Sequence, residues 1–304
     1  MNFYNQFLTP DQVALRELAR KIALEKILPI RAECDRESRF PEELLPVLAN
    51  ADIFGYYLGE QYQGTNFGFT GLGLVIEEFA RICPGIALLP GANALGTIPI
   101  YLHGTTEQKD FYLPQSAKGK ALFAFGLTEP GAGSDAGRMK TTAVKSGKGW
   151  VLNGTKYFIT NAGAAKYFII FAVTTKDEKF PKISAFIVEK GTPGFSLGKK
   201  EDKLGIRAST TYELIFEDCK IPNKNLLGRE GFGFIQVAMD TLNISRPGIA
   251  AQALGAAQGA LDLALIFIQQ REQGGQKISQ YQGIQWKFAD NGHADRNSPG
   301  PSLS

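Results

Sequence analysis

The chain has 304 residues, of which 44% are hydrophobic and 21% are charged, and its formal net charge is +3. This composition is ordinary for a globular protein of two or three domains, and the small, scattered charge gives no reason to expect nucleic-acid binding. The two histidines and three cysteines lack the spacing of metal ligands, so we expect no metal site. The N-terminus lacks the features of a signal peptide, and no apolar run of about 18 residues is seen. We therefore expect a cytoplasmic protein without a membrane span.

Residues 1–120 have the apolar spacing of α-helices. Thr9 and Gln12 form a capping box ahead of the first of them, which is expected to stop at Pro29. A second helix is predicted to open at Pro41, and others are predicted over residues 72–82, 92–101 and 106–114. The sequence therefore predicts an N-terminal helical domain.

Residues 121–230 favour strands instead. Asn153 and Gly154 stand between two short apolar runs, which is the pattern of a hairpin closed by a type I′ turn. Runs rich in β-branched and aromatic residues predict further strands at 121–127, 140–144, 167–173, 185–188 and 213–216. We predict a compact, antiparallel middle β domain.

Helical spacing returns in residues 231–290. Long helices are predicted over 232–243 and 248–271, and Gly255 and Gly259 would let another helix approach closely. A helix over 279–290 gives way to polar sequence rich in Pro, Gly and Ser. We therefore predict an incomplete C-terminal helical domain and a disordered or aberrant tail over residues 291–304.

One loop, Gly126–Gly137 (GLTEPGAGSDAG), places small residues and hydroxyls after a predicted strand. Its glycines match the dinucleotide-binding pattern G-x-G-x-x-A. That pattern must open a helix within a βαβ unit, whereas strands are predicted on both sides of this loop, so we reject a Rossmann fold. A second segment, Lys156–Gly163 (KYFITNAG), follows the predicted hairpin and also offers hydroxyls to a flat polar ligand.

These two segments, together with Lys203–Gly228, resemble the acyl-CoA dehydrogenase family, and the likeness extends over residues 1–290. The resemblance implies an α+β multidomain fold: an N-terminal all-α domain, a middle antiparallel β domain and a C-terminal helical bundle, with FAD between the last two. It implies an acyl-CoA substrate that is oxidised to the trans-2-enoyl-CoA in fatty acid metabolism. It also implies electron transfer flavoprotein as redox partner and assembly as a homotetramer. Several stretches look most like the short-chain, butyryl-CoA dehydrogenase-like members.

The resemblance also implies which residues of the first segment hold FAD. Backbone groups around Phe125, Leu127 and Thr128 would meet the pyrimidine side of the isoalloxazine. Donors at this place stabilise the negative charge that reduction brings to the flavin. Gly133 and Ser134 would lie near the pyrophosphate and the acyl-CoA entry, so Ser134 is also a candidate substrate contact.

The second segment and the C-terminal helices would supply the remaining FAD contacts. Phe158 would cover one face of the ring, next to Ile159, and Thr160 would bond flavin N5. Taken alone, Phe158 would be read as a core aromatic. Arg271 and Gln282 resemble an element that reaches the FAD of a neighbouring subunit, although Gly274 replaces its usual phenylalanine.

Asn243 and Arg246 are candidate substrate residues, because they are three apart on one predicted helix face. They resemble an Asp-x-x-Arg pair that contacts the CoA moiety, for which the fork of an arginine is well suited. A simple pair on the helix surface is the alternative.

The family's catalytic glutamate is expected to be absent from this chain, which leaves the catalytic residue unknown. Most relatives carry this glutamate far along the C-terminal domain, and a few carry it directly before the CoA-binding arginine, where this chain has Ser245. Asp240 and Glu230 are near that helix in sequence only. Two alternatives stay open: a non-catalytic FAD- or acyl-CoA-binding remnant, and a flavoprotein acyl-CoA oxidase.

Overall fold

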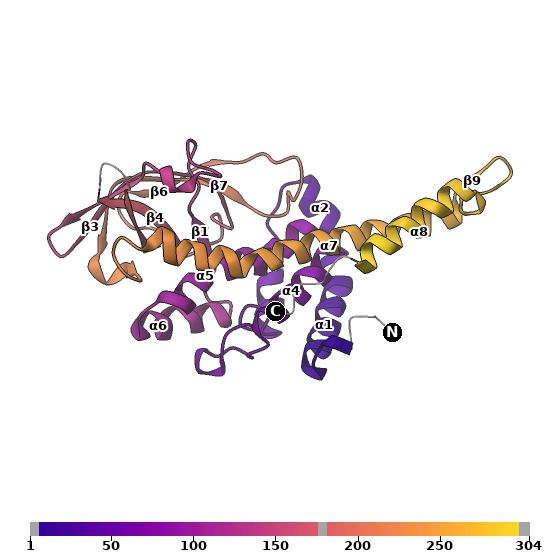
Figure 1. Ribbon diagram of the computed structural model, residues 1–304, viewed down its shortest axis with the longest axis horizontal. Helices are drawn as coiled ribbons and strands as arrows, with labels where there is room; N and C mark the ends of the chain where they lie inside the picture. Colours follow the sequence, from indigo (N-terminus) through magenta and orange to yellow (C-terminus); the bar gives the residue numbers. More distant parts are fainter. Residues whose placement is uncertain (1–5, 176–180, 298–304) are drawn as a thin grey trace.

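The computed structural model describes residues 6–175 and 181–297, in which two helical regions flank a β-rich region (Figure 1). The predicted order of helical, β and helical regions is confirmed. Thr9 begins the first helix through the predicted capping box, in which the Gln12 amide donates to Thr9 Oγ1 at 3.2 Å. The N-terminal helices are α1 (Pro10–Ile22), α2 (Arg31–Arg36), α3 (Leu44–Asn50), α4 (Gly68–Ala80), α5 (Pro84–His103) and α6 (Thr106–Ala117). A π-helical turn, Ala23–Ile27, continues α1.

Helix α5 corrects the expectation that helix begins only after Pro90. It starts at Pro84, where a proline is tolerated at the first turn, and continues through Pro90 and Pro99. Both internal prolines cost hydrogen bonds. Burial of most of α5 against the rest of the molecule outweighs that cost, which a local sequence pattern does not reveal.

The β region is one sheet in the order β6-β7-β3-β2-β4-β5-β8, with β1 added beside β4. Its strands are β1 (Phe123–Gly126), β2 (Thr142–Ser146), β3 (Gly149–Thr160), β4 (Tyr167–Thr175), β5 (Lys182–Glu189), β6 (Phe195–Lys200), β7 (Thr211–Pro222) and β8 (Leu226–Leu227). Most pairs are antiparallel, as predicted. However, β1 runs parallel to β4, and β2 also meets β4 in parallel. A parallel pair needs a long connection, which the intervening loop and hairpin provide.

The predicted hairpin turn at Asn153-Gly154 is wrong. Strand β3 runs straight through these residues, and the turn between β2 and β3 lies at Gly147 instead, where φ is +56°. A type I′ turn needs positive φ at both central residues, but of this pair only Gly154 has it, at +141°. Gly154 is a glycine for another reason: an added Cβ would lie 2.7 Å from the Cα of Thr141.

The C-terminal region is dominated by one long helix, α7 (Met239–Gln270), which follows a π-helical turn, Gly233–Ala238. Two helices were predicted here, but α7 continues through Pro247 because its packing on α4 and α5 supports it. A short β9 (Glu272–Gln273) and β10 (Gln276–Lys277) then lead into α8 (Gln282–Asn297). Figure 1 shows this end of the chain as an arm that projects beyond the other elements.

Helix α8 also corrects the expected start of the tail. The helix continues to Asn297, so residues 291–297 are helical rather than disordered. They include no proline, and the first one that would stop a helix is Pro299. Residues 298–304 of the predicted tail lie outside the described residues.

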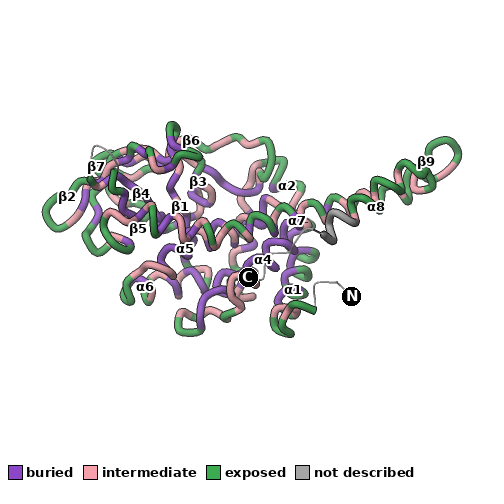
Figure 2. The backbone as a smooth tube through the Cα atoms, viewed as in Figure 1, coloured by how far each residue is buried: buried purple, intermediate pink, exposed green. Residues whose placement is uncertain are grey.

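The core has two parts, one on each face of the sheet. The larger part joins the N-terminal helices to the sheet, and the smaller part covers the opposite face around Trp150 and Phe216. Figure 2 shows that the outer side of α7 and most of α8 are exposed. This α7–α8 face contains the exposed apolar side chains Ile249, Leu263, Ile266, Phe267 and Trp286.

Within residues 6–175 and 181–297, two helical segments are long and apolar enough to cross a membrane by length and composition alone. Helix α5 is one, and 72% of its apolar window is buried inside the fold, as in a core helix. The other is Gly233–Gln270, of which 28% of the window is buried, because it forms part of the α7–α8 face.

Candidate active site

The structure brings the two motif segments side by side. The amide of Tyr157 in β3 donates to the carbonyl oxygen of Thr128 at 2.9 Å. Next to it, the Lys156 ammonium donates to the carbonyl oxygen of Leu127 at 3.1 Å. Two stretches that are far apart in the sequence therefore form one rim, where the end of β1 meets the end of β3.

The glycine-rich loop of the first segment is open to solvent. A tight turn, closed by two 3.1 Å hydrogen bonds between Glu129 and Ala132, precedes the exposed Gly133 and Ser134. An added Cβ at Gly131 or Gly133 would meet no atom within 4 Å. A short 3₁₀ turn follows rather than the long helix of a Rossmann motif, so the rejection of that motif is confirmed. The loop backbone is thus accessible to a ligand.

The second segment contains two strained residues. Phe158 has a φ of +59° and Asn161 a φ of +72°, and residues other than glycine adopt a positive φ only rarely. The pairing of β3 with β7 shifts register between Lys156 and Ile159, so β3 has a bulge that includes Phe158. The Phe158 side chain is 60% exposed, so it is not the core aromatic of the alternative interpretation. Strain of this kind concentrates at functional sites.

The other predicted FAD residues differ in what they can offer a ligand. Phe125 is half-buried and packs against Phe171 with ring centroids 5.0 Å apart. Leu127 and Ile159 are buried, so they would meet a ligand mainly through their backbones. Thr128 and Thr160 are half-buried. The N–H of Thr128 makes no hydrogen bond to any residue that the structure describes.

A buried ion pair behind this rim was missed by the sequence reasoning. Lys156 is fully buried, and its ammonium lies 2.8 Å from Glu129 Oε1. Glu129 also accepts the backbone amides of Lys140 at 2.6 Å and Thr141 at 3.0 Å. Lys156 lies four residues after the buried Leu152. Residues an even number apart in a strand lie on the same face, so this spacing could have predicted an inward-facing lysine.

Burial and the ion pair together set the pKa of each partner. Desolvation lowers the pKa of Lys156 to about 8, against the opposing effect of Glu129. Desolvation also acts to raise the pKa of Glu129, but the Lys156 charge and the hydrogen bonds to this carboxylate outweigh it and hold the pKa below its ordinary value. Both groups are therefore charged at neutral pH.

Asn243 and Arg246 share a face of α7, as predicted. The Arg246 guanidinium donates to Asn243 Oδ1 at 2.6 Å, and both residues are exposed. The start of this helical region adjoins the first segment, because the Phe234 ring lies 3.6 Å from where a Cβ on Gly137 would be. Ser245 donates to the Leu242 carbonyl oxygen at 3.2 Å.

The structure does not bring Arg271 and Gln282 to the rim. Arg271 directly follows α7 and Gln282 begins α8, and both are exposed. Figure 1 shows the segment between these two helices at the end of the projecting arm. Within one chain they are far from the glycine-rich loop.

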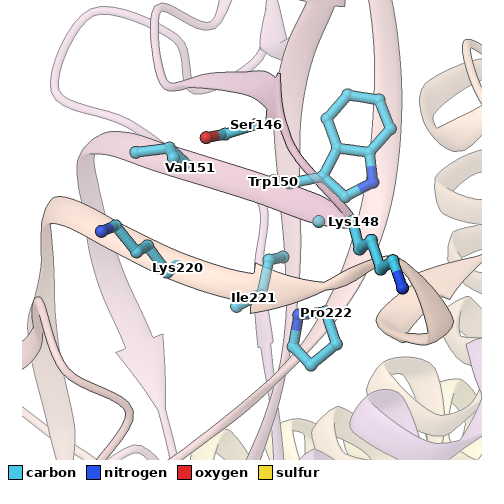
Figure 3. Close-up of a pocket in the computed structure, with 8 residues that line it drawn as sticks. Ser146, Lys148, Trp150, Val151, Lys220, Ile221 and Pro222 are labelled. Atoms are coloured by element: carbon cyan, nitrogen blue, oxygen red, sulfur yellow. The ribbon is translucent and has the colours of Figure 1, made fainter.

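Two other possible sites can be set aside. The described residues hold no group of three or more His, Cys, Asp or Glu that could bind a metal. Figure 3 shows a hollow of about 330 Å³ between the ends of β3 and β7, lined by Ser146, Lys148, Gly149, Trp150, Val151, Lys220, Ile221 and Pro222. It lies at the opposite end of β3 from Phe158, about 25 Å away by the rise of a strand.

Comparison with known proteins places this geometry in a family. The sequence matches the family models described as the acyl-CoA dehydrogenase N-terminal domain (residues 9–120), middle domain (124–219) and C-terminal domain (232–291). It is 45% identical over 285 residues to the acryloyl-CoA reductase (NADH) of Anaerotignum propionicum, covering 93% of this chain and 72% of that protein. The chain belongs to the acyl-CoA dehydrogenase family. Members of this family are flavoprotein oxidoreductases that bind FAD.

Solved structures agree with this membership. The chain superimposes on butyryl-CoA dehydrogenase from Megasphaera elsdenii with a TM-score of 0.91 and 42% identity, covering 95% of this chain and 76% of that one. It also matches a chain in a structure described as the electron transferring flavoprotein of Acidaminococcus fermentans, with a TM-score of 0.90 and 41% identity, over 99% and 82% of the two chains.

The rim fits the FAD of an acyl-CoA dehydrogenase. It combines a glycine-rich backbone with no side chain in the way, the unpaired Thr128 N–H and a strained, exposed aromatic at Phe158. Such a set suits a flat ring that carries polar groups along one edge and a pyrophosphate beyond it.

Proposed function

We propose that this chain catalyses the FAD-dependent α,β-dehydrogenation of a short-chain acyl-CoA to its trans-2-enoyl-CoA. The observation that supports this best is the junction of the two segments, in which Tyr157 and Lys156 hold the carbonyls of Thr128 and Leu127. That junction lies between the two motif segments, which together with the adjacent Phe125 contain the predicted flavin contacts other than Arg271 and Gln282. The name of the Megasphaera elsdenii neighbour, butyryl-CoA dehydrogenase, supports a short acyl chain.

Each residue of the rim has a role in this proposal. Thr128 would hold the pyrimidine edge of the flavin through its backbone N–H and hydroxyl, Thr160 would hold the region of N5, and Phe158 would cover one face. Bound FAD would supply the hydride acceptor for the β-hydrogen of the substrate. Arg246, oriented by Asn243, binds a phosphate or carbonyl oxygen of the CoA moiety.

Two carboxylates near the start of α7, Glu230 and Asp240, already have partners, and the proposal does not assign the base that removes the α-proton to either of them. Glu230 forms an ion pair with Lys145 at 2.7 Å, and Asp240 lies 3.0 Å from His103 Nε2. Ser245 is not a base, and its hydroxyl donates to a backbone carbonyl. We therefore propose that the usual glutamate is absent from the described residues.

Reduction of an enoyl-CoA is a second candidate function. It is favoured by the 45% identity to the acryloyl-CoA reductase (NADH) of Anaerotignum propionicum. The same residues serve both directions, because a site that stabilises one transition state stabilises it for either direction of the reaction.

The partners in this proposal are electron transfer flavoprotein and further copies of the chain in a homotetramer. The match to a chain in the Acidaminococcus fermentans structure supports the first. The α7–α8 face supports the second, because an exposed apolar surface of this kind marks an interaction site. Cytoplasmic localisation stays a prediction.

The test is the absorbance spectrum of the purified protein, followed by anaerobic addition of butyryl-CoA. A yellow protein whose flavin band bleaches supports dehydrogenation, and longer acyl-CoAs then define the chain length. A yellow protein that no acyl-CoA bleaches, but whose chemically reduced flavin is reoxidised by an enoyl-CoA, favours the reductase. A yellow protein that reacts with neither favours the non-catalytic alternative. Hydrogen peroxide formed under air favours the oxidase, and a colourless protein contradicts the proposal.

A further inference from the structure

The buried Lys156–Glu129 pair fixes three successive residues of the rim. Lys156 donates to the Leu127 carbonyl oxygen at 3.1 Å and to Glu129 Oε1 at 2.8 Å. Between these two points, the Thr128 carbonyl accepts the Tyr157 amide at 2.9 Å. The backbone carbonyls of Leu127 and Thr128 and the side chain of Glu129 are therefore held from behind by β3, with one bond at each residue.

The carbonyl of Leu127 determines where the N–H of Thr128 points. Both groups belong to one planar trans peptide, in which the C=O and the N–H point in opposite directions. Because Lys156 draws the carbonyl toward the interior, the N–H of Thr128 is turned away from Lys156. That N–H has no partner among the described residues, so it is available to a ligand.

Stability alone does not explain a charged pair at this place. Buried ion pairs that are replaced by apolar residues of similar volume often leave stability unchanged or raise it. A gain in stability is therefore not enough to account for this pair. The pair contacts the Leu127 carbonyl and, through Glu129, the amides of Lys140 and Thr141. These contacts lie at the two ends of the glycine-rich loop.

We propose that Lys156 and Glu129 are positioning residues that aim the Thr128 N–H at the bound flavin, an inference that rests on the proposed FAD function. Neither residue touches the substrate. Their effect is on how tightly FAD is held and how strongly the reduced flavin is stabilised, because a fixed donor that faces developing charge costs no reorganisation.

The deciding variant is the double substitution Glu129→Gln with Lys156→Met, which removes both charges and keeps the shapes. The matched control is Glu230→Gln with Lys145→Met, a pair of the same chemistry that is exposed and 2.7 Å apart. FAD affinity of the deflavinated proteins is measured by fluorescence titration, together with the visible spectrum and midpoint potential of the bound flavin. Circular dichroism and thermal unfolding of the FAD-free proteins report whether each variant folds.

The expected result is a folded double variant whose Kd for FAD rises about tenfold, which corresponds to about 1.4 kcal/mol. Its flavin band is shifted and its midpoint potential is more negative, while the control pair changes none of these. A folded double variant with unchanged FAD affinity, spectrum and potential overturns the inference alone. A wild-type protein that binds no FAD overturns the proposed function, and the inference with it.

A second variant decides the case if the double variant does not fold. The substitution Glu129→Gln keeps the shape of the side chain and leaves the hydrogen bond from Lys156 to the Leu127 carbonyl in place. A buried lysine without its carboxylate partner can lose a proton, and the neutral amine can still donate to that carbonyl. We expect a smaller loss of FAD affinity, of a fewfold, with a spectral shift in the same direction. Unchanged affinity and spectrum in this folded variant overturn the inference.

Discussion

Replacing Gly259 by alanine should force two packed helices apart. A Cβ at this position would lie 2.9 Å from the carbonyl carbon of Arg81 and closer still to its oxygen. Ordinary carbon–carbon contacts are about 3.5–4.0 Å, so the contact with the carbonyl carbon alone requires α7 to move away from the end of α4 by roughly 0.6–1.1 Å, and the closer oxygen requires more. The Arg81–Asp262 ion pair, now 2.6 Å, and the bond from Gln258 to Glu77 would lengthen with it.

The expected cost follows from two opposing effects. Overpacking typically costs about 1–3 kcal/mol, and alanine in a helix interior recovers about 0.5–1 kcal/mol relative to glycine. The net loss is therefore about 1–2 kcal/mol. For a chain of this length, about 1.6 °C of melting temperature corresponds to 1 kcal/mol, so the midpoint should fall by about 2–3 °C.

The matched control for this prediction is Gly292→Ala in α8, where an added Cβ meets nothing within 4 Å. It should raise the midpoint by about 1 °C, because only the helix propensity changes. Thermal unfolding followed by far-UV circular dichroism compares the two variants. A Gly259→Ala protein that is as stable as Gly292→Ala would refute the argument from close packing.

Three further predictions concern the candidate site. The pKa of Lys156 is about 8 in the folded chain and 10.5 ordinarily, so the unfolded chain binds more protons between these two pH values. The unfolding free energy of the wild type, measured by urea titration relative to the Glu129→Gln/Lys156→Met variant, should therefore rise from pH 8 to pH 10.5. The same difference should shrink as the pH falls below 4.5, because the folded pKa of Glu129 is lowered, and a flat profile would contradict both statements. Phe158→Gly should stabilise the FAD-free protein by about 1 kcal/mol through relief of its positive φ, yet weaken FAD binding in fluorescence titration; a loss of stability would show that the exposed ring packs in the fold. Arg246→Ala should raise KM for acyl-CoA about tenfold or more with little change in kcat, and Arg246→Lys should recover part of it; equal KM values would leave this arginine a surface partner of Asn243.

Local signals predicted the start of the first helix, the loop after β1 and the spacing of small residues in α7 correctly. The capping box at Thr9 formed as expected, and so did the shared face of Asn243 and Arg246, because both depend only on neighbours within a few residues. The close approach at Gly255 and Gly259 was also confirmed, since a four-residue spacing of small side chains leaves a groove on any helix.

Local signals failed where distant packing decided the backbone. Asn153-Gly154 has the composition of a turn, yet it lies inside the long strand β3. A glycine is required there because a Cβ at residue 154 would clash with Thr141. Pro90 and Pro247 have the composition of helix ends, but burial of α5 and the support that α7 receives from α4 and α5 carry both helices through them.

The sequence by itself determined the order of the regions, the absence of a Rossmann loop and the position of the two motif segments, because each of these depends on contiguous residues. Only the tertiary structure decided that β1 lies parallel to β4, that Phe158 stands exposed on a bulge, and that Lys156 reaches Glu129 behind the rim. Residues 27 apart become partners only when the sheet aligns β1 and β3, and the cost of burying a charge then requires that the two be paired.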